Sequence, residues 1–252
     1  MSQDKRRPIL QHFGELKGRL IKCLIAMAVG IGISFPFCPK IFEVLKSRAE
    51  GIDLIYTHVV EYLGTYMKLA LYCGIALALP FVIYEVIMFV SPGLKAREKR
   101  YLYSLMPAVA LLFISGVAFA YFILLPPALN FLLTFSGEIA QPLITIENYV
   151  SVVIRLLFAM GLVFEIPLIM GFLSMIGVVT PQWMAKNRKW AFVVAFILGA
   201  AITPTIDPVN QTLVAVPIII LWEMSIWLVK LIWRRQRRPV PSEFEALTRP
   251  SH

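Results

Sequence analysis

Long apolar segments constrain this sequence more than any other feature. A helix needs about 20 predominantly apolar residues to cross the hydrocarbon core of a bilayer. Four segments meet that length with at most two charges each: 69–90, 101–125, 149–179 and 209–229. Hydrophobic residues make up 59% of the chain and charged residues 15%, against roughly 45–50% and 25% in globular chains. We therefore predict an all-α integral membrane protein.

Two further apolar segments, 23–39 and 190–203, are shorter. Lys22 and Lys40 flank the first of these, and their long side chains can snorkel outward and extend its usable length. The second ends at the break 203–208, where two prolines remove backbone donors. At about 1.5 Å per residue, 190–203 reaches roughly 21 Å. It can cross only where the bilayer thins or where neighbouring helices cover it.

The distribution of basic residues tests a count of six spans, because Lys and Arg accumulate in short cytoplasmic segments. Most of the 24 Lys and Arg residues lie in segments 1–22, 91–100, 180–189 and 230–252. The alternate loops hold only Lys40, Lys46 and Arg48. Both tails are strongly basic, so the number of crossings should be even. The prediction is a single membrane domain, 1–252, with six transmembrane helices, cytoplasmic termini and short fifth and sixth helices.

The loop after the first apolar segment shows a helical pattern of its own. Ile41, Phe42, Leu45 and Ala49 recur at helical spacing and predict an amphipathic helix along the outer surface. Pro39-Lys40 follows the first span without a small-residue cleavage site, so we expect that span to be retained and not removed as a signal peptide.

Enzyme and metal signatures are scarce. The nucleotide-binding pattern G-x-x-x-x-G-K-[ST] does not occur in the sequence. His12, His58 and His252 are all predicted outside the bilayer, which leaves no His for a metal site or a Ser-His pair inside a span. The three cysteines form no C-x-x-C pair. We expect no enzymatic activity, no cofactor and no metal.

Three carboxylates stand inside apolar helices: Glu85, Glu165 and Glu223. Charge at mid-bilayer is costly, so such groups usually face a bundle interior or a partner. Glu165 falls near the predicted midplane and should be mostly protonated there. Pro80 and Pro167 loosen the nearby backbone, which favours docking of a polar group from another helix. The alternative is a protonated carboxyl that is satisfied by a neighbouring helix.

Several stretches together match a known family. The chain resembles TatC, the receptor subunit of the twin-arginine protein translocase, from His12 to Glu223. The matching stretches, in order, are HFGELKGRL at 12–20, PFVIYE at 80–85, FVSPGL at 89–94, EKR at 98–100, FEIPL at 164–168, Thr203-Pro204, Asp207-Pro208, AVP at 215–217 and Glu223. Their order and the span pattern make the resemblance specific, although each stretch alone is weak.

The resemblance implies a non-enzymatic receptor in the prokaryotic cytoplasmic membrane. It implies that the chain binds signal peptides with two adjacent arginines on folded cargo, at its cytoplasmic face. It also implies assembly with single-span partners of the TatA and TatB type, and with further copies of the chain inside the complex. The basic tails then anchor topology and contact lipid, and no nucleic acid is expected.

Carried over residue by residue, the resemblance places signal recognition at Glu15 and Glu98, with Phe89 and Pro92 shaping the loop nearby. Arg binds carboxylates through two parallel hydrogen bonds, which suits this assignment. The alternative is pairing of both carboxylates with local basic residues. Lys17 and Arg19 belong to the same patch, and Lys17 departs from the Arg usual in the family. Other family-motif positions are Pro80, Thr203, Pro204, Asp207 and Pro208.

Two other functions remain open from the residues alone. A proton- or ion-coupled secondary transporter would also use carboxylates in the membrane, although the motif spacing shows no inverted repeat. An RNA-binding or ribosome-docking factor would use the basic tails and would bind in a salt-dependent way. Export of a folded reporter with a twin-arginine signal separates these functions from the one that the resemblance implies.

Overall fold

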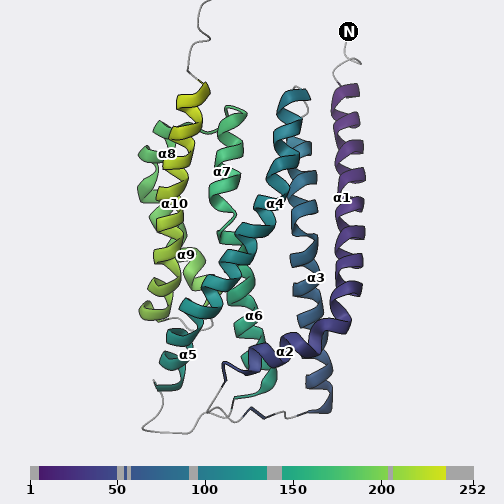
Figure 1. The fold of residues 1–252 in the computed structure, drawn as a ribbon, viewed down its shortest axis with the longest axis vertical. Helices are drawn as coiled ribbons and strands as arrows, with labels where there is room; N and C mark the ends of the chain where they lie inside the picture. The colour runs from purple at the N-terminus through teal and green to yellow at the C-terminus, as the bar shows by residue number, and fades with distance from the viewer. Residues whose placement is uncertain are drawn as a thin grey trace, which may run out of the picture.

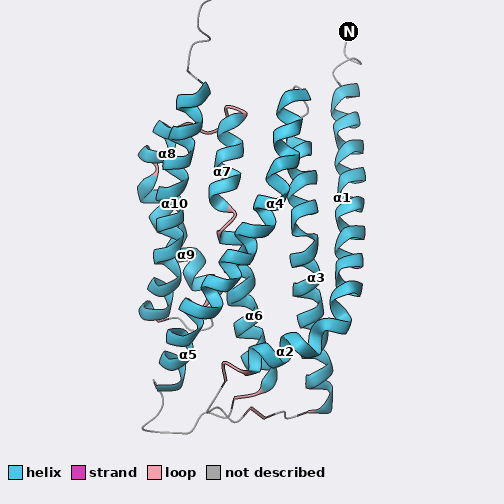
Figure 2. Cartoon of the chain, in the orientation of Figure 1, coloured by secondary structure: helices cyan, strands magenta, loops and turns pink. Residues whose placement is uncertain are grey.

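The computed structural model describes residues 6–49, 54–55, 58–90, 96–134, 144–203 and 207–236. These residues form a bundle of helices, as predicted (Figure 2). The one β feature among them is an isolated parallel bridge between Ile55 and Thr145. The first helix begins and the last helix ends at the same end of the bundle, which we call the termini end (Figure 1). The opposite end is called the capped end.

Helix α1 (Arg6–Ser34) starts well before the predicted span 23–39 and ends in the 3-10 turn η1 (Phe35–Phe37). Prolines then stand in the first turns of both η1 and α2 (Cys38–Lys46). Because proline has no backbone N–H, the chain changes direction there, and α2 lies across the capped end (Figure 1). Leu45 and Ala49 are buried against the bundle, so the predicted amphipathic helix is confirmed.

Helix α1 packs along α3 (Val59–Val90) through small residues. A Cβ atom added to Gly30 would collide with the backbone of Gly74, and one added to Gly74 would collide with the backbone of Ile31. Close backbone approach of this kind is common where membrane helices pack, because small side chains let the helices come together. Pro80 lies inside α3 without ending it.

Helix α4 (Ala96–Phe119) crosses the bundle diagonally towards the capped end (Figure 1). It continues through a π-helical turn, η2 (Ala120–Leu124), into α5 (Leu125–Thr134). The predicted span 101–125 is therefore too short at its end. Pro126 and Pro127 lie in the first turn of α5, where proline is tolerated, and they do not end the helix.

The predicted span 149–179 is two helices, α6 (Ile146–Val163) and α7 (Ile166–Met175). The prediction of one continuous helix over 149–179 is therefore wrong. The break falls at Phe164 and Glu165, and Pro167 stands in the first turn of α7. Proline cannot donate the backbone hydrogen bond that would join the two helices into one.

Beyond α7, the short α8 (Pro181–Lys186) leads into α9 (Arg188–Ile202), and then into α10 (Pro208–Gln236). The short fifth helix is confirmed, because α9 has 15 residues. The prediction of a short sixth helix is wrong, because α10 has 29 residues. Pro217 does not end α10, and its basic last turns remain helical beyond the predicted end at Val229.

Among the described residues, five helical segments are long and apolar enough to cross a membrane: Gly14–Lys46, Val60–Phe89, Met106–Phe131, Ile146–Met175 and Pro208–Arg234. Helix α9 is below that length and packs along α10 through one face, on which Ala195, Gly199 and Ile202 are buried. Gln211 Nε2 of α10 donates to the Phe196 carbonyl oxygen of α9 over 2.8 Å. The arrangement agrees with a multi-pass membrane protein of six helices, the fifth of which packs on the sixth.

The capped end is held by contacts between distant segments. Ile146 N donates to the Ile55 carbonyl over 2.9 Å, which completes the bridge between the two connections. Glu61 of α3 accepts from the Glu147 N–H in the first turn of α6. Lys68 forms an ion pair with Glu147. These contacts fix α3 against α6.

Candidate functional site

Glu85 is a buried carboxylate near the termini end of α3, and α1 supplies its partners. Arg19 Nη1 donates to Glu85 Oε2 over 2.6 Å, and Lys22 Nζ lies 3.9 Å from Oε1. A buried charge is tolerated where it is paired and hydrogen-bonded. Glu85 is therefore paired within the chain, by cations of α1.

This pairing affects Glu15, which lies one helical turn before Arg19 on α1. Residues four apart on a helix are neighbours, so Arg19 would be the natural local partner of Glu15. Arg19 is instead engaged by Glu85. Glu15 and Lys17 are both exposed, and Glu15 forms no ion pair with any residue whose side chain the structure describes. A carboxylate is thereby left open to solution at the termini end.

The other predicted recognition residues are only partly placed. Phe89 is half-buried at the end of α3. The backbone of Glu98 lies in the first turn of α4, while its side chain falls outside the described residues. Pro92 also lies outside them. The start of α1 and the start of α4 lie at the termini end (Figure 1). Glu15 falls in the first half of α1 and Glu98 in the first turn of α4, so both belong to the half of the bundle nearer that end.

Glu165 differs from the other two membrane carboxylates. It is 1% exposed and occupies the break between α6 and α7. Neither carboxyl oxygen has a hydrogen-bond partner among the described residues. Helix α4 passes close by, since a Cβ added to Gly116 would lie 2.6 Å from the Met160 carbonyl oxygen and 2.9 Å from Cβ of Phe164. A buried carboxyl without a hydrogen-bond partner costs free energy.

Glu223 of α10 is paired by a residue that the sequence reasoning did not single out. Arg188, at the start of α9, donates from Nη2 to Glu223 Oε2 over 2.8 Å, and its Nε lies 2.7 Å from Oε1. This is the bidentate geometry that Arg favours with carboxylates. Both side chains are partly exposed. No local pattern could have found the pair, because it joins two helices.

The motif residues around the break before α10 build a local cap. Asp207 Oδ1 accepts a hydrogen bond from the Asn210 backbone N–H over 2.7 Å, and Pro208 is the first residue of α10. Thr203 Oγ1 donates to the Gly199 carbonyl over 2.9 Å. Pro204 lies outside the described residues. These residues end α9 and start α10, which is a structural role.

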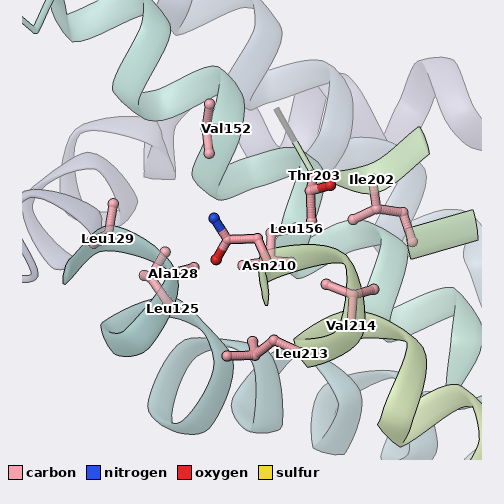
Figure 3. Close-up of a pocket in the computed structure, with 10 residues that line it drawn as sticks. All are labelled: Leu125, Ala128, Leu129, Val152, Leu156, Ile202, Thr203, Asn210, Leu213 and Val214. Carbon is pink, nitrogen blue, oxygen red and sulfur yellow. The ribbon is translucent and has the colours of Figure 1, made fainter. Parts of the chain in front are cut away.

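Beside this break lies a small enclosed cavity of about 20 Å³. Asn210 and Thr203 contribute its polar groups, and Leu125, Ala128 and Leu129 of α5 form the facing wall (Figure 3). A space of this size holds about one water molecule. Asn210, which was not among the predicted residues, is thus the polar centre of the contact between α5 and α10.

Pro80 lines a larger apolar groove of about 520 Å³ between α1 and α4. Ile33, Phe37, Cys73 and Phe113 are among its other lining residues. The fold and these sites define a multi-pass helical membrane protein without an evident reaction centre among its described residues. Glu85 and Glu223 are paired between helices, whereas the buried Glu165 carboxyl has no hydrogen-bond partner among the described residues.

Comparisons with known proteins identify the class more closely. Residues 11–217 match the family model described as Sec-independent protein translocase protein (TatC). The TatC protein of Carboxydothermus hydrogenoformans is 35% identical over 232 residues, covering 91% of this chain and 96% of that protein. The Aquifex aeolicus TatC is 38% identical, covering 91% of this chain and 98% of that protein. The chloroplastic TATC of Arabidopsis thaliana is 34% identical and covers 93% of this chain.

A solved structure agrees with the sequence relatives. The crystal structure of the twin arginine translocase receptor TatC superposes with a TM-score of 0.78 at 39% identity, covering 88% of this chain and all of that one. The chain belongs to the TatC family and is a component of the Sec-independent, twin-arginine protein translocase. The resemblance seen in the motifs is confirmed, and the transporter and RNA-binding alternatives are set aside.

Proposed function

We propose that this chain is the receptor of its translocase and binds twin-arginine signals at the termini end through Glu15 and Glu98. The observation that carries the proposal is the Arg19–Glu85 pair, which engages the cation one helical turn after Glu15 on α1. Glu15 is left as an exposed acceptor, and a guanidinium group can bind it through two hydrogen bonds. The α4 backbone brings Glu98 to the same end of the bundle.

The remaining residues of the patch act around these two acceptors. Phe89 and Pro92 shape the connection between α3 and α4. Lys17 is exposed on α1 and keeps the segment basic, while Arg19 acts indirectly by holding Glu85. In this proposal the termini end faces the cytoplasm of a prokaryotic cell, as the excess of basic residues there favours.

Glu165 is proposed as the docking point for a partner helix. Single-span partners of the TatA and TatB type would offer a polar side chain to the incomplete carboxyl between α6 and α7. Glu85 and Glu223 would contribute through their pairs with α1 and α9, which set how these helices stand against the bundle. Assembly of several copies belongs to the same proposal, and the chain itself performs no bond chemistry.

The test measures crosslinking of the full chain to a synthetic signal peptide with two adjacent arginines. Glu15→Ala and Glu98→Ala should each weaken binding roughly tenfold or more, because a hydrogen bond to a charged group contributes about 1.5–3 kcal/mol. Glu43→Ala is the matched control, since Glu43 is an exposed carboxylate on α2 at the capped end. A peptide with two lysines should bind weakly to every variant. Unchanged yield in both Glu15→Ala and Glu98→Ala would refute the proposal.

A further inference from the structure

The tryptophans of this chain gather at one place. All five lie in its last third, at positions 183, 190, 222, 227 and 233. They belong to α8, the first turn of α9 and the second half of α10, with Trp222 at the middle of α10. Helix α8 and the last turns of α10 lie at the termini end (Figure 1). Trp227 is 71% exposed, and Trp183 and Trp190 are also exposed. Exposed tryptophans on membrane proteins concentrate at the level of the lipid headgroups, which locates this part of the bundle at the bilayer interface.

An open groove of about 520 Å³ lies within this region, between α8 and the last turns of α10. Pro181, Gln182 and Ala185 form one wall, and Lys230, Trp233 and Arg234 form the other. Lys230 and Arg234 are four residues apart on α10, so they project from the same side of the helix. The groove therefore combines two cations and an amide with apolar surface.

The two cations are not neutralised by the part of the chain that the structure describes. The ion pairs there involve Arg19, Lys22, Lys68 and Arg188, and neither Lys230 nor Arg234 joins one. Lys230 Nζ lies 5.4 Å from the centre of the Trp227 ring. A cation over an aromatic ring keeps its N–H donors available on its other side. The groove thus presents two cations that have no acidic partner among the described residues.

We propose that this groove binds the headgroup of an anionic phospholipid. Its phosphate would accept hydrogen bonds from Lys230 and Arg234, and Gln182 would donate to a remaining oxygen. The lipid's glycerol end would lie against Pro181 and Trp233. Basic pockets between membrane helices are typical sites for anionic headgroups. A soluble anion would match the cations but would make no use of the apolar wall.

The test uses the purified full chain in mild detergent, with lipid binding followed by native mass spectrometry. The probes are dioleoyl phosphatidylglycerol and the zwitterionic dioleoyl phosphatidylcholine. The first phosphatidylglycerol molecule to bind each protein should bind at least about tenfold more tightly than the first phosphatidylcholine molecule. The double variant K230Q/R234Q should lose that preference, since each basic side chain near a membrane surface contributes to the attraction of anionic lipid.

The matched control is K186Q/K189Q, which removes the same charge from exposed positions at the same end, outside the groove. It should change the affinity for phosphatidylglycerol less than about twofold. K230R/R234K keeps both charges and should retain the preference. It tests the role of charge independently of any folding defect in K230Q/R234Q. Equal losses in the two Gln double variants would mean general surface charge and would overturn the proposal. Displacement of the lipid by millimolar glycerol phosphate would also overturn it, because the site would then bind a soluble phosphate.

Discussion

Arg19 of α1 donates a hydrogen bond to Glu85 of α3 over 2.6 Å, although the two residues are 66 positions apart in the chain. Helix α1 packs mainly on α3, so this contact helps to set how α1 stands on the rest of the bundle. The proposed receptor surface depends on it, because Arg19 would otherwise be available to Glu15. The pair connects the internal structure of the bundle to the surface where a signal would bind.

The first prediction concerns this pair. Glu85→Ala should destabilise the protein by about 1–3 kcal/mol, somewhat less than the loss typical of a fully buried pair, because Arg19 is partly exposed and can be solvated. The same change at Glu223 should cost about 1 kcal/mol or less, since both members of its pair are partly exposed. Thermal unfolding in mild detergent compares the two. The exchange Arg19→Glu with Glu85→Arg should recover part of the loss, and no recovery would argue against a direct ion pair.

A second prediction concerns the crossing of α1 and α3. Gly30→Ala should lower the unfolding temperature, because its Cβ would collide with the backbone of Gly74 and the helices would have to separate. Gly32→Ala is the control on the same helix, where an added Cβ meets nothing within 4 Å. That change should be neutral or slightly stabilising, since Ala is the better helix former. If the two variants unfolded alike, the close approach of α1 to α3 would be wrong.

The sequence predicted the class of fold because long apolar segments and basic flanks are set by the bilayer itself. It could not predict the break at Glu165, since the apolar pattern runs on from α6 into α7 and only Pro167 marks the change. The predicted sixth span was too short for a different reason. The last turns of α10 are basic, and hydropathy ends a span where charge begins, although the helix continues to Gln236.

The candidate site could be predicted only in part. Glu85, Glu165 and Glu223 stood out because carboxylates are rare in apolar helices. Their three different environments depend on contacts between helices, such as Arg188 with Glu223, that no spacing along the chain encodes. The exposed acceptor at Glu15 came from a family resemblance, and the structure adds the reason why Arg19 does not neutralise it.

A third prediction concerns topology. If the termini end is cytoplasmic and α9 crosses, Val209→Cys at the capped end should react with an impermeant thiol reagent added from outside the cell. Lys186→Cys at the termini end should react only after the membrane is opened. The unsubstituted chain measures the background, since Cys23 and Cys38 are buried and Cys73 is half-buried. The reverse labelling pattern would remove the six-helix topology.

The last prediction separates docking from proton transfer at Glu165. Its two oxygens have no hydrogen-bond partner, so a polar group from a partner helix would satisfy them. Glu165→Gln keeps a donor and an acceptor but cannot titrate, whereas Glu165→Ala keeps neither. With docking, Gln should retain most partner crosslinking and export of a folded reporter, and Ala should lose much of both. Glu165→Ala also leaves a cavity, so its unfolding temperature must be measured to separate lost docking from lost stability.

A proton relay would give a different result. It would need a series of titratable groups across the membrane, and Glu85 and Glu223 are already held by Arg19 and Arg188. If Glu165→Gln were as inactive as Glu165→Ala while partner crosslinks stayed intact, titration of the carboxyl would be the essential property. Glu165 would then act in proton transfer, and its assignment as a docking point would have to be abandoned.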